Sequence, residues 1–250
     1  PFVDVILPNY NKADFLEEAI NSVINQTYKN WYLYIIDNHS KDDSLKKIEK
    51  FSHMNNIKII SFKKNKGPAF SRNYGMRISQ SKYISFLDSD DGWTKDKLKK
   101  QLSFMEKNNL NFTYTDYTPF FEENGIKKIK KKTNIKDKFT FNTFIKNTSI
   151  NTTTMIISRS ILGTNRFKKV YLEDYLFKCK ILKMKNIIAI KLAENLAFYR
   201  IIYKSRSRDR LKNIFSLWSI NKNYNKLNLI QNVTSIFFAI INSIRKYGIK

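Results

Sequence analysis

Three carboxylates within four residues are the clearest chemical feature of this chain. They lie in Phe86-Leu87-Asp88-Ser89-Asp90-Asp91, at the end of an apolar run. Such a density of negative charge repels itself, but it suits a hard divalent cation, because Mg²⁺ and Mn²⁺ take oxygen ligands and commonly share them with substrate phosphates. The alternative is a solvated turn whose aspartate caps a helix expected near Lys95 to Lys107. The residues alone leave metal binding and a capped turn equally open.

The elements that must position these carboxylates are visible in residues 1–91. Four short apolar runs, rich in β-branched and aromatic residues, indicate strands buried on both faces. The runs are Val3 to Leu7, Trp31 to Ile36, Ile57 to Ile60, and Tyr83 to Leu87. Amphipathic patterns at residues 15–24, 43–51 and 67–78 separate them. This alternation predicts a parallel sheet with right-handed crossovers.

Polar residues follow three of the predicted strands. They are Pro8-Asn9-Tyr10-Asn11, Asp37-Asn38-His39-Ser40 and Asp88-Ser89-Asp90-Asp91. Because ligands of open α/β sheets bind beyond the carboxyl ends of the strands, the three loops predict one binding cleft. No GxGxxG motif follows the first strand and no GxxxxGK[ST] motif occurs. A dinucleotide-binding fingerprint and P-loop chemistry are therefore disfavoured.

The chain is strongly basic. Its 250 residues carry 46 Lys and Arg against 21 Asp and Glu, a formal net charge of +25. Nucleic acid, anionic lipid and polyphosphate all match that sign, but Lys, Asn and Ile are abundant together, so charge alone selects no partner. The single cysteine, Cys179, excludes an intramolecular disulfide and a thiolate zinc cage and suits a reducing compartment.

Beyond residue 110 the pattern changes. Strands are predicted at Phe112 to Thr115 and at Thr154 to Ile157, and an amphipathic helix at Leu172 to Leu182, with Cys179 on its apolar side. Residues 127–138 hold seven lysines and one aspartate. Because like charges repel, we expect a solvated hairpin or loop there rather than a site.

Six tracts, taken together in their order and spacing, resemble a known family. They are Leu7-Pro8-Asn9-Tyr10-Asn11, Gln26-Thr27-Tyr28 with Trp31, Ile36-Asp37-Asn38-His39-Ser40-Lys41-Asp42, Asn65-Lys66-Gly67, Ser71-Arg72-Asn73-Tyr74-Gly75, and Phe86-Leu87-Asp88-Ser89-Asp90-Asp91. Residues 1–120 are similar to the GT-A nucleotide-sugar domain of the family 2 glycosyltransferases, inverting bacterial enzymes that build surface polysaccharides. The resemblance implies an α/β fold with a Rossmann-like, mostly parallel sheet flanked by helices and a small C-terminal helical extension.

The resemblance also implies a UDP-sugar donor. Asp37 matches the aspartate that accepts from uracil N3–H, and Arg72 matches an arginine near the nucleotide. Asp88 and Asp90 match the DxD motif, in which Asp90, or its neighbour Asp91, would hold an Mn²⁺ or Mg²⁺ that bridges the diphosphate. The implied donor-binding residues are Pro8, Asn9, Tyr10, Asn11, Asp37, Asn38, Gly67, Arg72, Asp88 and Ser89, and the implied metal ligands are Asp90, Asp88 and Asp91.

Two departures from the family are visible. Relatives often have Asp and then Gly where this chain has Asn38 and His39, which weakens the match to a uracil site. His39 is expected to be a solvent-facing loop residue. Many relatives also have a histidine shortly after a pair such as Tyr199-Arg200; none follows here, so a histidine metal ligand from that segment is absent.

An acidic pair, Glu173-Asp174, resembles the family's pair at a helix start. Inversion at the anomeric carbon needs a base on the face opposite the leaving group. Adjacent helical residues point about 100° apart, so one carboxylate can face a cleft squarely. The match implies Asp174 as base and Glu173 in a supporting role. The alternative is two acidic residues that suit the dipole of a first helical turn.

The acceptor side resembles the family more loosely, over residues 147–200, where residues 151–154 could offer threonine hydroxyls to a sugar. In an apolar stretch, Val233 to Ile244, five residues fall on one helical face: Ile236, Phe237, Ile240, Ile241 and Ile244. The stretch is too short and polar to span a bilayer, which needs about 20 mostly apolar residues. Basic residues precede it, and the combination indicates binding to anionic lipid. A domain cap or dimer contact is the alternative. The basic residues are Lys204, Arg206, Arg208, Arg210 and Lys212.

These features predict a metal-dependent inverting glycosyltransferase. It would move a hexose or N-acetylhexosamine from a UDP-sugar to a hydroxyl of a lipid-linked saccharide, in the synthesis of a surface polysaccharide or glycan. The expected divisions are a donor half at 1–120, an acceptor half of the same domain at 121–204 and a basic helical extension at 205–250. No signal-peptide pattern occurs. From the basic amphipathic tail and the lipid-linked acceptor, the enzyme is expected in the cytoplasm, peripheral on the inner face of the membrane.

Two alternatives stay open. A nucleotidyltransferase of related fold could use a similar acidic loop but would release pyrophosphate instead of UDP. A nucleic-acid-binding module would use the basic charge, although no RNP-like, helix-turn-helix or zinc-finger signature is present, so no nucleic acid is expected as a partner.

Overall fold

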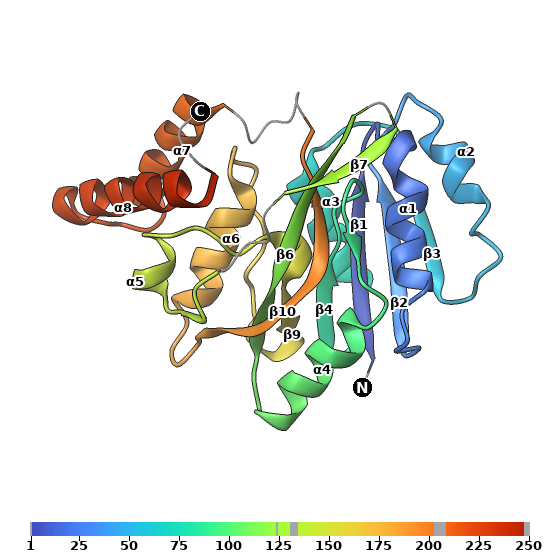
Figure 1. The fold of residues 1–250 in the computed structure, drawn as a ribbon, viewed down its shortest axis with the longest axis horizontal. Coiled ribbons are helices and arrows are strands. Elements are labelled where there is room, and N and C mark those ends of the chain that lie inside the picture. The colour runs from blue at the N-terminus through green and yellow to red at the C-terminus, as the bar shows by residue number, and fades with distance from the viewer. Residues whose placement is uncertain (1, 124, 131–134, 203–208, 248–250) are drawn as a thin grey trace.

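The computed structural model describes residues 2–123, 125–130, 135–202 and 209–247, and within them ten strands form one sheet (Figure 1). The strands are β1 (Val3–Asn9), β2 (Trp31–Asp37), β3 (Ile57–Ser61), β4 (Tyr83–Phe86), β5 (Gly92–Trp93), β6 (Phe112–Glu123), β7 (Ile126–Ile129), β8 (Lys138–Phe139), β9 (Ile156–Ser158) and β10 (Ala189–Arg200). Their order is β3-β2-β1-β4-β9-β6-β10-β5, with β7 on β6 and β8 on β10.

Helices flank this sheet. They are α1 (Ala13–Ile24), α2 (Ser44–Glu49), α3 (Pro68–Ile78), α4 (Lys97–Lys107), α5 (Phe141–Phe144), α6 (Glu173–Leu182), α7 (Arg210–Asn223) and α8 (Leu229–Tyr247), with 3₁₀ turns η1 (Thr152–Thr154) and η2 (Arg159–Ile161). The chain adds β2 and β3 in turn on one side of β1, and then returns to the other side of β1 to form β4. Because crossovers are right-handed, α1 and α2 lie on one face and α3 on the other. The helices expected at 15–24, 43–51 and 67–78 are thus confirmed.

The parallel sheet predicted from residues 1–91 is confirmed in β3-β2-β1-β4. β1 pairs in parallel with β2 from Val3↔Trp31 to Asn9↔Asp37, and with β4 from Val3↔Tyr83. β1 and β4 are buried along most or all of their length, as expected for strands covered on both faces. β3, at the edge of the sheet, differs from that expectation, because only Ile57 is buried in it. Their carboxyl ends, and the polar loops that follow, therefore meet at one edge.

The other half of the sheet mixes directions. β6 and β10 pair in parallel, while β9 pairs antiparallel with both β4 and β6. β7 folds back on the end of β6, so the lysine-rich segment begins in a hairpin, as predicted, and residues 131–134 lie outside the described residues. A turn this short joins only antiparallel strands.

The strand predicted at Thr154 to Ile157 is wrong at its start. Residues 152–154 form η1, and β9 begins at Ile156. The Asn151 side chain accepts from the Thr153 backbone N at 2.9 Å, and the Asn151 carbonyl accepts from Thr154 Oγ1 at 2.8 Å. These side-chain bonds satisfy the backbone in a turn instead of a ladder.

The C-terminal helices α7 and α8 form a pair at one end of the molecule, beyond the sheet (Figure 1). The helix predicted at Val233 to Ile244 is confirmed and longer than expected. Of the predicted basic residues before it, Lys204, Arg206 and Arg208 lie outside the described residues. Among the described residues, none of the helices has the length and apolar character needed to cross a membrane.

Candidate functional site

The acidic loop, residues 88–91, follows β4, and its last residue, Asp91, anchors it through buried hydrogen bonds. Asp91 Oδ2 accepts from Thr153 Oγ1 at 2.6 Å, and Asp91 Oδ1 accepts from the Arg200 backbone N at 3.0 Å. Burial, together with Asp90 and Asp88 nearby, raises the pKa of Asp91 well above its usual value. Asp88 and Asp90 instead face outward, with 33 % and 23 % of their side chains exposed.

Two cations from other elements neutralise the outward carboxylates. Arg72 of α3 donates through Nη2 to Asp88 Oδ1 at 2.7 Å, and Lys12, just before α1, donates to Asp90 Oδ2 at 2.7 Å. Arg200 of β10 adds a bond from Nε to the Asp90 backbone oxygen at 3.0 Å. The repulsion within the acidic cluster is thus offset by the protein's own side chains.

Arg72 also joins the acidic loop to the start of α6. Its Nη1 donates to Glu173 Oε1 at 3.1 Å, so one buried guanidinium bridges Asp88 and Glu173, which comes from a segment 101 residues further along the chain than Arg72. Burial alone would lower the pKa of Arg72, but the two carboxylates raise it above its ordinary value. The bridge fixes the two acidic segments relative to each other.

Asp174 is the more open member of the acidic pair. Its side chain is 37 % exposed, whereas that of Glu173 is 10 % exposed. Lys178, one turn later and buried, donates to Asp174 Oδ2 at 2.7 Å, and Thr152 Oγ1 donates to the same oxygen at 3.3 Å. Burial would raise the pKa of Asp174, but the Lys178 ammonium outweighs it and lowers the pKa to about 2. Asp174 is therefore ionised at neutral pH.

The loops after β1 and β2 are tied together by side chains. Asn9 Nδ2 donates to Asp37 Oδ1 at 2.8 Å, and the Ser40 backbone N donates to Asp37 Oδ2 at 3.0 Å. Asn38 Nδ2 donates to Asn65 Oδ1 at 2.8 Å, which links these loops to the segment before α3. Asp37 is fully buried, and its two carboxylate oxygens hold the loop after β1 and the loop after β2 together.

The other predicted donor residues lie at the same edge with different exposures. Tyr10 is 43 % exposed, and Asn11 accepts through Oδ1 from the Lys41 backbone N. Pro8 lies within β1, and Ser89 is buried in the acidic loop. Gly67 precedes α3 with φ of +87°, a left-handed conformation that favours glycine. All the predicted segments therefore converge on one edge of the sheet.

Four residues of this network carried no predicted role at the donor site or the base. Lys12, Thr153, Lys178 and Arg200 each contact a predicted site residue. Lys178 could have been found, because a lysine four residues after an aspartate in a helix is a pairing signal. Residues 151–154 could offer threonine hydroxyls to an acceptor sugar, but the hydroxyl of Thr153 is buried and donates to Asp91.

Residues 4–167 match the model of Glycosyl transferase family 2. The chain belongs to this family. Its relatives include the Escherichia coli UDP-Glc:alpha-D-GlcNAc-diphosphoundecaprenol beta-1,3-glucosyltransferase WfgD, 34 % identical over 87 % of this chain and 84 % of that protein. WfaP, an Escherichia coli enzyme with the same activity in its name, is 29 % identical over 98 % of this chain and 95 % of its own length.

Solved structures share the fold of this family 2 glycosyltransferase. S. aureus TarS 1-349 in complex with UDP-GlcNAc aligns with a TM-score of 0.74 at 19 % identity, over 98 % of this chain and 73 % of that one. The mannosyltransferase PcManGT from Pyrobaculum calidifontis, in complex with GDP-Man and Mn²⁺, aligns with a TM-score of 0.70 at 13 % identity, over 96 % and 72 %. The predicted GT-A fold is therefore confirmed, and the family decides against a nucleotidyltransferase or a nucleic-acid-binding module.

Proposed function

We propose that this glycosyltransferase is an inverting, metal-dependent enzyme that moves a hexose or N-acetylhexosamine from a UDP-sugar to a hydroxyl of a lipid-linked saccharide. The observation that carries the proposal is the Asp174 carboxylate, exposed and ionised, joined through Glu173 and Arg72 to the acidic loop at Asp88. The names of WfgD and WfaP support the substrates, since both specify UDP-Glc and a diphosphoundecaprenol acceptor.

A nucleobase fits the edge formed by the β1 and β2 loops. Among the described residues, Asn9 Oδ1 is buried without a hydrogen-bond partner, and Asn9 contacts Asp37 through its amide nitrogen. A buried acceptor of this kind costs free energy until a donor reaches it. The N3–H of uracil is such a donor. Asp37, the predicted acceptor, is fully buried and already accepts from Asn9 and Ser40, so Asn9 takes that role in this proposal. The exposed ring of Tyr10 supplies a stacking surface for the base.

The acidic loop fits a hard divalent cation that the donor helps to bind. Asp90 and Asp88 present carboxylate oxygens, which Mg²⁺ and Mn²⁺ prefer. Among the described residues, no three His, Cys, Asp or Glu side chains gather into a metal site. Of the three predicted metal ligands, Asp91 is buried and accepts from Thr153 and Arg200 instead. The protein would supply one or two ligands through Asp90 and Asp88, and the donor diphosphate would supply others. Such a cation neutralises charge on the leaving diphosphate when bound.

The protein's own residues account for the remaining chemistry. Asp174 accepts the proton of the attacking hydroxyl while the new bond to the anomeric carbon forms and the bond to UDP breaks, with the electron pair leaving on the diphosphate. Arg72 and Lys12 place positive charge beside that leaving group. Lys178 holds the Asp174 carboxylate in position.

The division of labour follows the order of the chain. Residues 1–120 bind the donor, residues 121–204 bind the acceptor, and residues 205–250 form a helical extension. Because the acceptor would be anchored in lipid, the enzyme works at the inner face of the cell membrane, from the cytoplasmic side.

Calorimetric binding of UDP, GDP and ADP, with and without Mn²⁺, tests the proposal. We expect UDP-selective binding that Mn²⁺ strengthens and that Asp90→Ala weakens. Glu49→Ala is the matched control, because Glu49 is an exposed carboxylate on α2 away from the site. Absence of nucleotide binding in every condition would contradict the proposal, as would equal effects of the two variants. Release of pyrophosphate instead of UDP during turnover would contradict the reaction.

A further inference from the structure

Helix α8 presents its apolar side to solvent. At about 100° per residue, six of its apolar side chains fall within an arc of about 100°. All six are exposed, from 37 % for Ile240 to 77 % for Ile230. They are Leu229, Ile230, Val233, Phe237, Ile240 and Ile244. A surface helix normally turns such a stripe toward the core, so this helix is inverted relative to the usual arrangement.

Polar and small residues occupy the buried side of α8. Ser235 donates through Oγ to the Ile145 carbonyl at 2.7 Å and accepts from Asn221 Nδ2 of α7 at 3.0 Å. Asn221 Oδ1 in turn accepts from the Tyr175 hydroxyl of α6 at 2.7 Å. Asn232 donates to the Trp218 carbonyl at 3.2 Å. Rotation of α8 to bury its apolar stripe would break these buried bonds, so the outward orientation is fixed.

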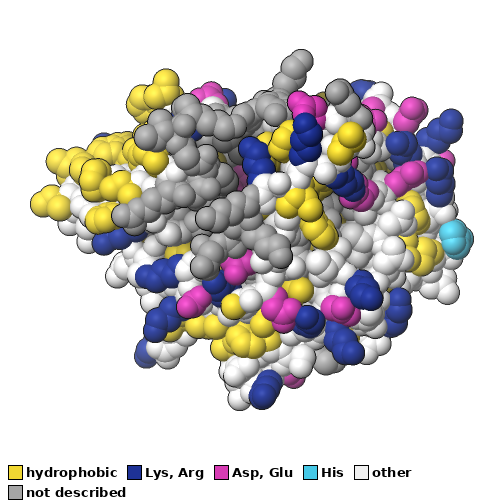
Figure 2. Space-filling model, in the orientation of Figure 1, with side chains coloured by type: hydrophobic (Ala, Val, Ile, Leu, Met, Phe, Trp, Pro, Cys, Tyr) yellow, Lys and Arg dark blue, Asp and Glu magenta, His cyan; other side chains and the backbone are white. Residues whose placement is uncertain are grey.

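The neighbouring helix α7 also exposes apolar side chains. Leu211 and Phe215 of α7, four residues apart, are 70 % and 71 % exposed. Figure 2 shows hydrophobic side chains gathered over the end of the molecule that α7 and α8 form. We name the six exposed side chains of α8, with Leu211 and Phe215, the α7–α8 surface. Soluble monomers seldom expose a contiguous apolar patch of this kind without a partner.

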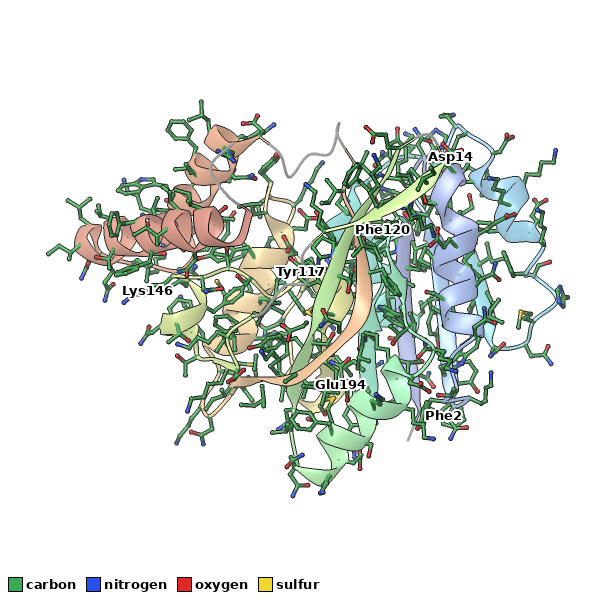
Figure 3. The ribbon with its side chains drawn as sticks, viewed as in Figure 1. Phe2, Asp14, Tyr117, Phe120, Lys146 and Glu194 are labelled. Atoms are coloured by element: carbon green, nitrogen blue, oxygen red, sulfur yellow. The ribbon has the colours of Figure 1, made fainter. Side chains whose placement is uncertain are left out.

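Charge selects the partner. Residues 209–250 contain seven Lys or Arg and a single acidic residue, Asp209, which caps α7 by accepting from the Lys212 backbone N. Lys146, labelled in Figure 3, adds a cation beside α8, with Nζ 5.7 Å from the centre of the Phe238 ring. A second copy of the chain, with a net charge of +25, would be repelled from this basic region. A membrane with anionic headgroups complements it, since basic residues beside an apolar helix face suit the headgroup and acyl boundary.

The structure assigns the α7–α8 surface as the docking site for an anionic lipid bilayer. The apolar side chains enter the boundary between headgroups and acyl chains, and the flanking Lys and Arg contact lipid phosphates. This assignment deepens the proposed function and rests on it for the lipid-linked acceptor. Binding to lipid itself needs no catalysis and is measured separately.

Co-sedimentation of the full chain with vesicles tests the assignment. One set of vesicles is phosphatidylcholine alone, and the other is equal parts phosphatidylcholine and phosphatidylglycerol. We compare the parent with Ile230→Ser/Phe237→Ser and, in case that variant folds poorly, with Leu211→Ser/Phe215→Ser. The matched control is Ile126→Ser/Ile129→Ser, because these β7 side chains are 64 % and 68 % exposed on a different surface. Circular dichroism verifies folding.

We expect the parent to bind the anionic vesicles and the β7 control to bind like the parent. Each apolar side chain of the α7–α8 surface that is replaced by serine should weaken this binding by about tenfold. Failure of the parent to bind, equal binding to both kinds of vesicle, or equal binding of all variants would overturn the assignment. So would a parent dimer, seen by sedimentation, that the α7–α8 variants dissociate. Lipid binding without UDP binding in calorimetry would refute the proposed function and leave the assignment standing.

Discussion

Asp174 is the residue whose chemistry is most sharply defined by its neighbours. Asp174→Asn keeps the size of the side chain but removes its ability to accept a proton. We expect a fall in kcat of about 10²–10⁴-fold, with UDP binding unchanged, measured by UDP release and by calorimetry. Asp14→Asn, an exposed aspartate in the first turn of α1 (Figure 3), should leave both unchanged. Full turnover by Asp174→Asn would show that another group is the base.

Lys178 controls the protonation of Asp174. Because the Lys178 ammonium lowers the pKa of Asp174 to about 2, the carboxylate stays ionised as the pH falls through the range where enzymes are assayed. In Lys178→Met the ammonium is gone and burial raises that pKa, so the acidic limb of kcat/KM should move to higher pH. Lys180→Met, on the same helix, should keep the parent profile. An unshifted profile in Lys178→Met would mean that the limb belongs to a different group.

Lys97 is a buried cation outside the site. Among the described residues its Nζ has no hydrogen-bond partner, lies 4.2 Å from the Trp93 ring centre, and has a pKa that burial lowers to about 7. The unfolded chain therefore binds more protons between pH 7 and the ordinary lysine pKa, so stability rises with pH across that window. Lys97→Met should raise the free energy of unfolding at pH 7 by about 1–3 kcal/mol and flatten that pH dependence.

Urea unfolding at several pH values measures the effect of Lys97→Met. Lys99→Met, on the exposed side of the same helix, is the control and should keep the parent's dependence. A Lys97→Met variant no more stable than the parent would mean that the Trp93 ring compensates the buried charge.

Residue patterns could identify site residues within each tract of the sequence, but not the contacts between residues of distant tracts. The Asp88 to Asp91 cluster and the Glu173-Asp174 pair are visible because their members are adjacent in sequence. The pairing of Lys12 with Asp90 spans 78 residues and that of Arg72 with Glu173 spans 101. No local spacing encodes such contacts, because the crossover of the sheet creates them.

At the scale of elements, the close packing of α3 on β1 depends on Gly75. A Cβ at this position would lie 2.6 Å from Ile6 Cγ2, in the buried core. Gly75→Ala should lower the free energy of unfolding by about 1–3 kcal/mol because Ile6 must shift. Gly92→Ala is the control, since its nearest neighbour is 3.9 Å away. Urea unfolding measures both.

A double variant separates this clash from an effect of backbone entropy. Ile6→Val removes a methyl group beside the new Cβ, so Gly75→Ala should cost less in the Ile6→Val background than in the parent. Strictly additive effects would mean that the added methyl group does not meet Ile6. In that case the effect of Gly75→Ala on stability would arise from a contact of α3 other than the one with Ile6.

Elements with a strong repeating pattern were predictable and those held by side-chain bonds were not. β1, β2, β3 and β4 match the predicted runs to within two residues, because a strand buried on both faces is nearly continuous in apolar residues. Thr154, the last residue of the η1 turn, was mistaken for the start of a strand, because threonine favours strands unless a side chain such as that of Asn151 satisfies the backbone first. His39 was expected to face solvent but is half-buried with φ of +70°, the conformation suited to the glycine of its relatives.

At the scale of the whole molecule, positive charge is spread over every part of the chain. The site gathers acidic groups at one edge of the sheet, and four of them pair with a cation, while most remaining Lys and Arg lie on the surface. The four are Asp88, Asp90, Glu173 and Asp174. The sequence predicted that the protein is positively charged but not which partner the charge attracts, because a net charge does not say where the charged side chains lie. The fold supplies this information by placing the exposed apolar face of α8 in a part of the molecule that is rich in Lys and Arg.

The same charge should make the stability of the folded chain depend on salt. Self-repulsion among exposed cations destabilises the compact state, and the Debye length falls from about 30 Å at 0.01 M to about 10 Å at 0.1 M salt. We expect the Tm to rise over that range, by about 2–4 °C for each kcal/mol of repulsion removed. A variant with Lys63, Lys64, Lys99 and Lys107 changed to Gln lowers the net charge from +25 by four to +21.

This variant should start with a higher Tm at low salt and respond less to added NaCl, as measured by differential scanning calorimetry. Its four positions are exposed, and none is among the described hydrogen-bond partners of the acidic loop, so donor binding should not change. A parent Tm that does not move with NaCl would contradict the prediction. An equal response in parent and variant would assign the stabilisation to ion binding at a particular place, because general screening must weaken as the charge it acts on is removed.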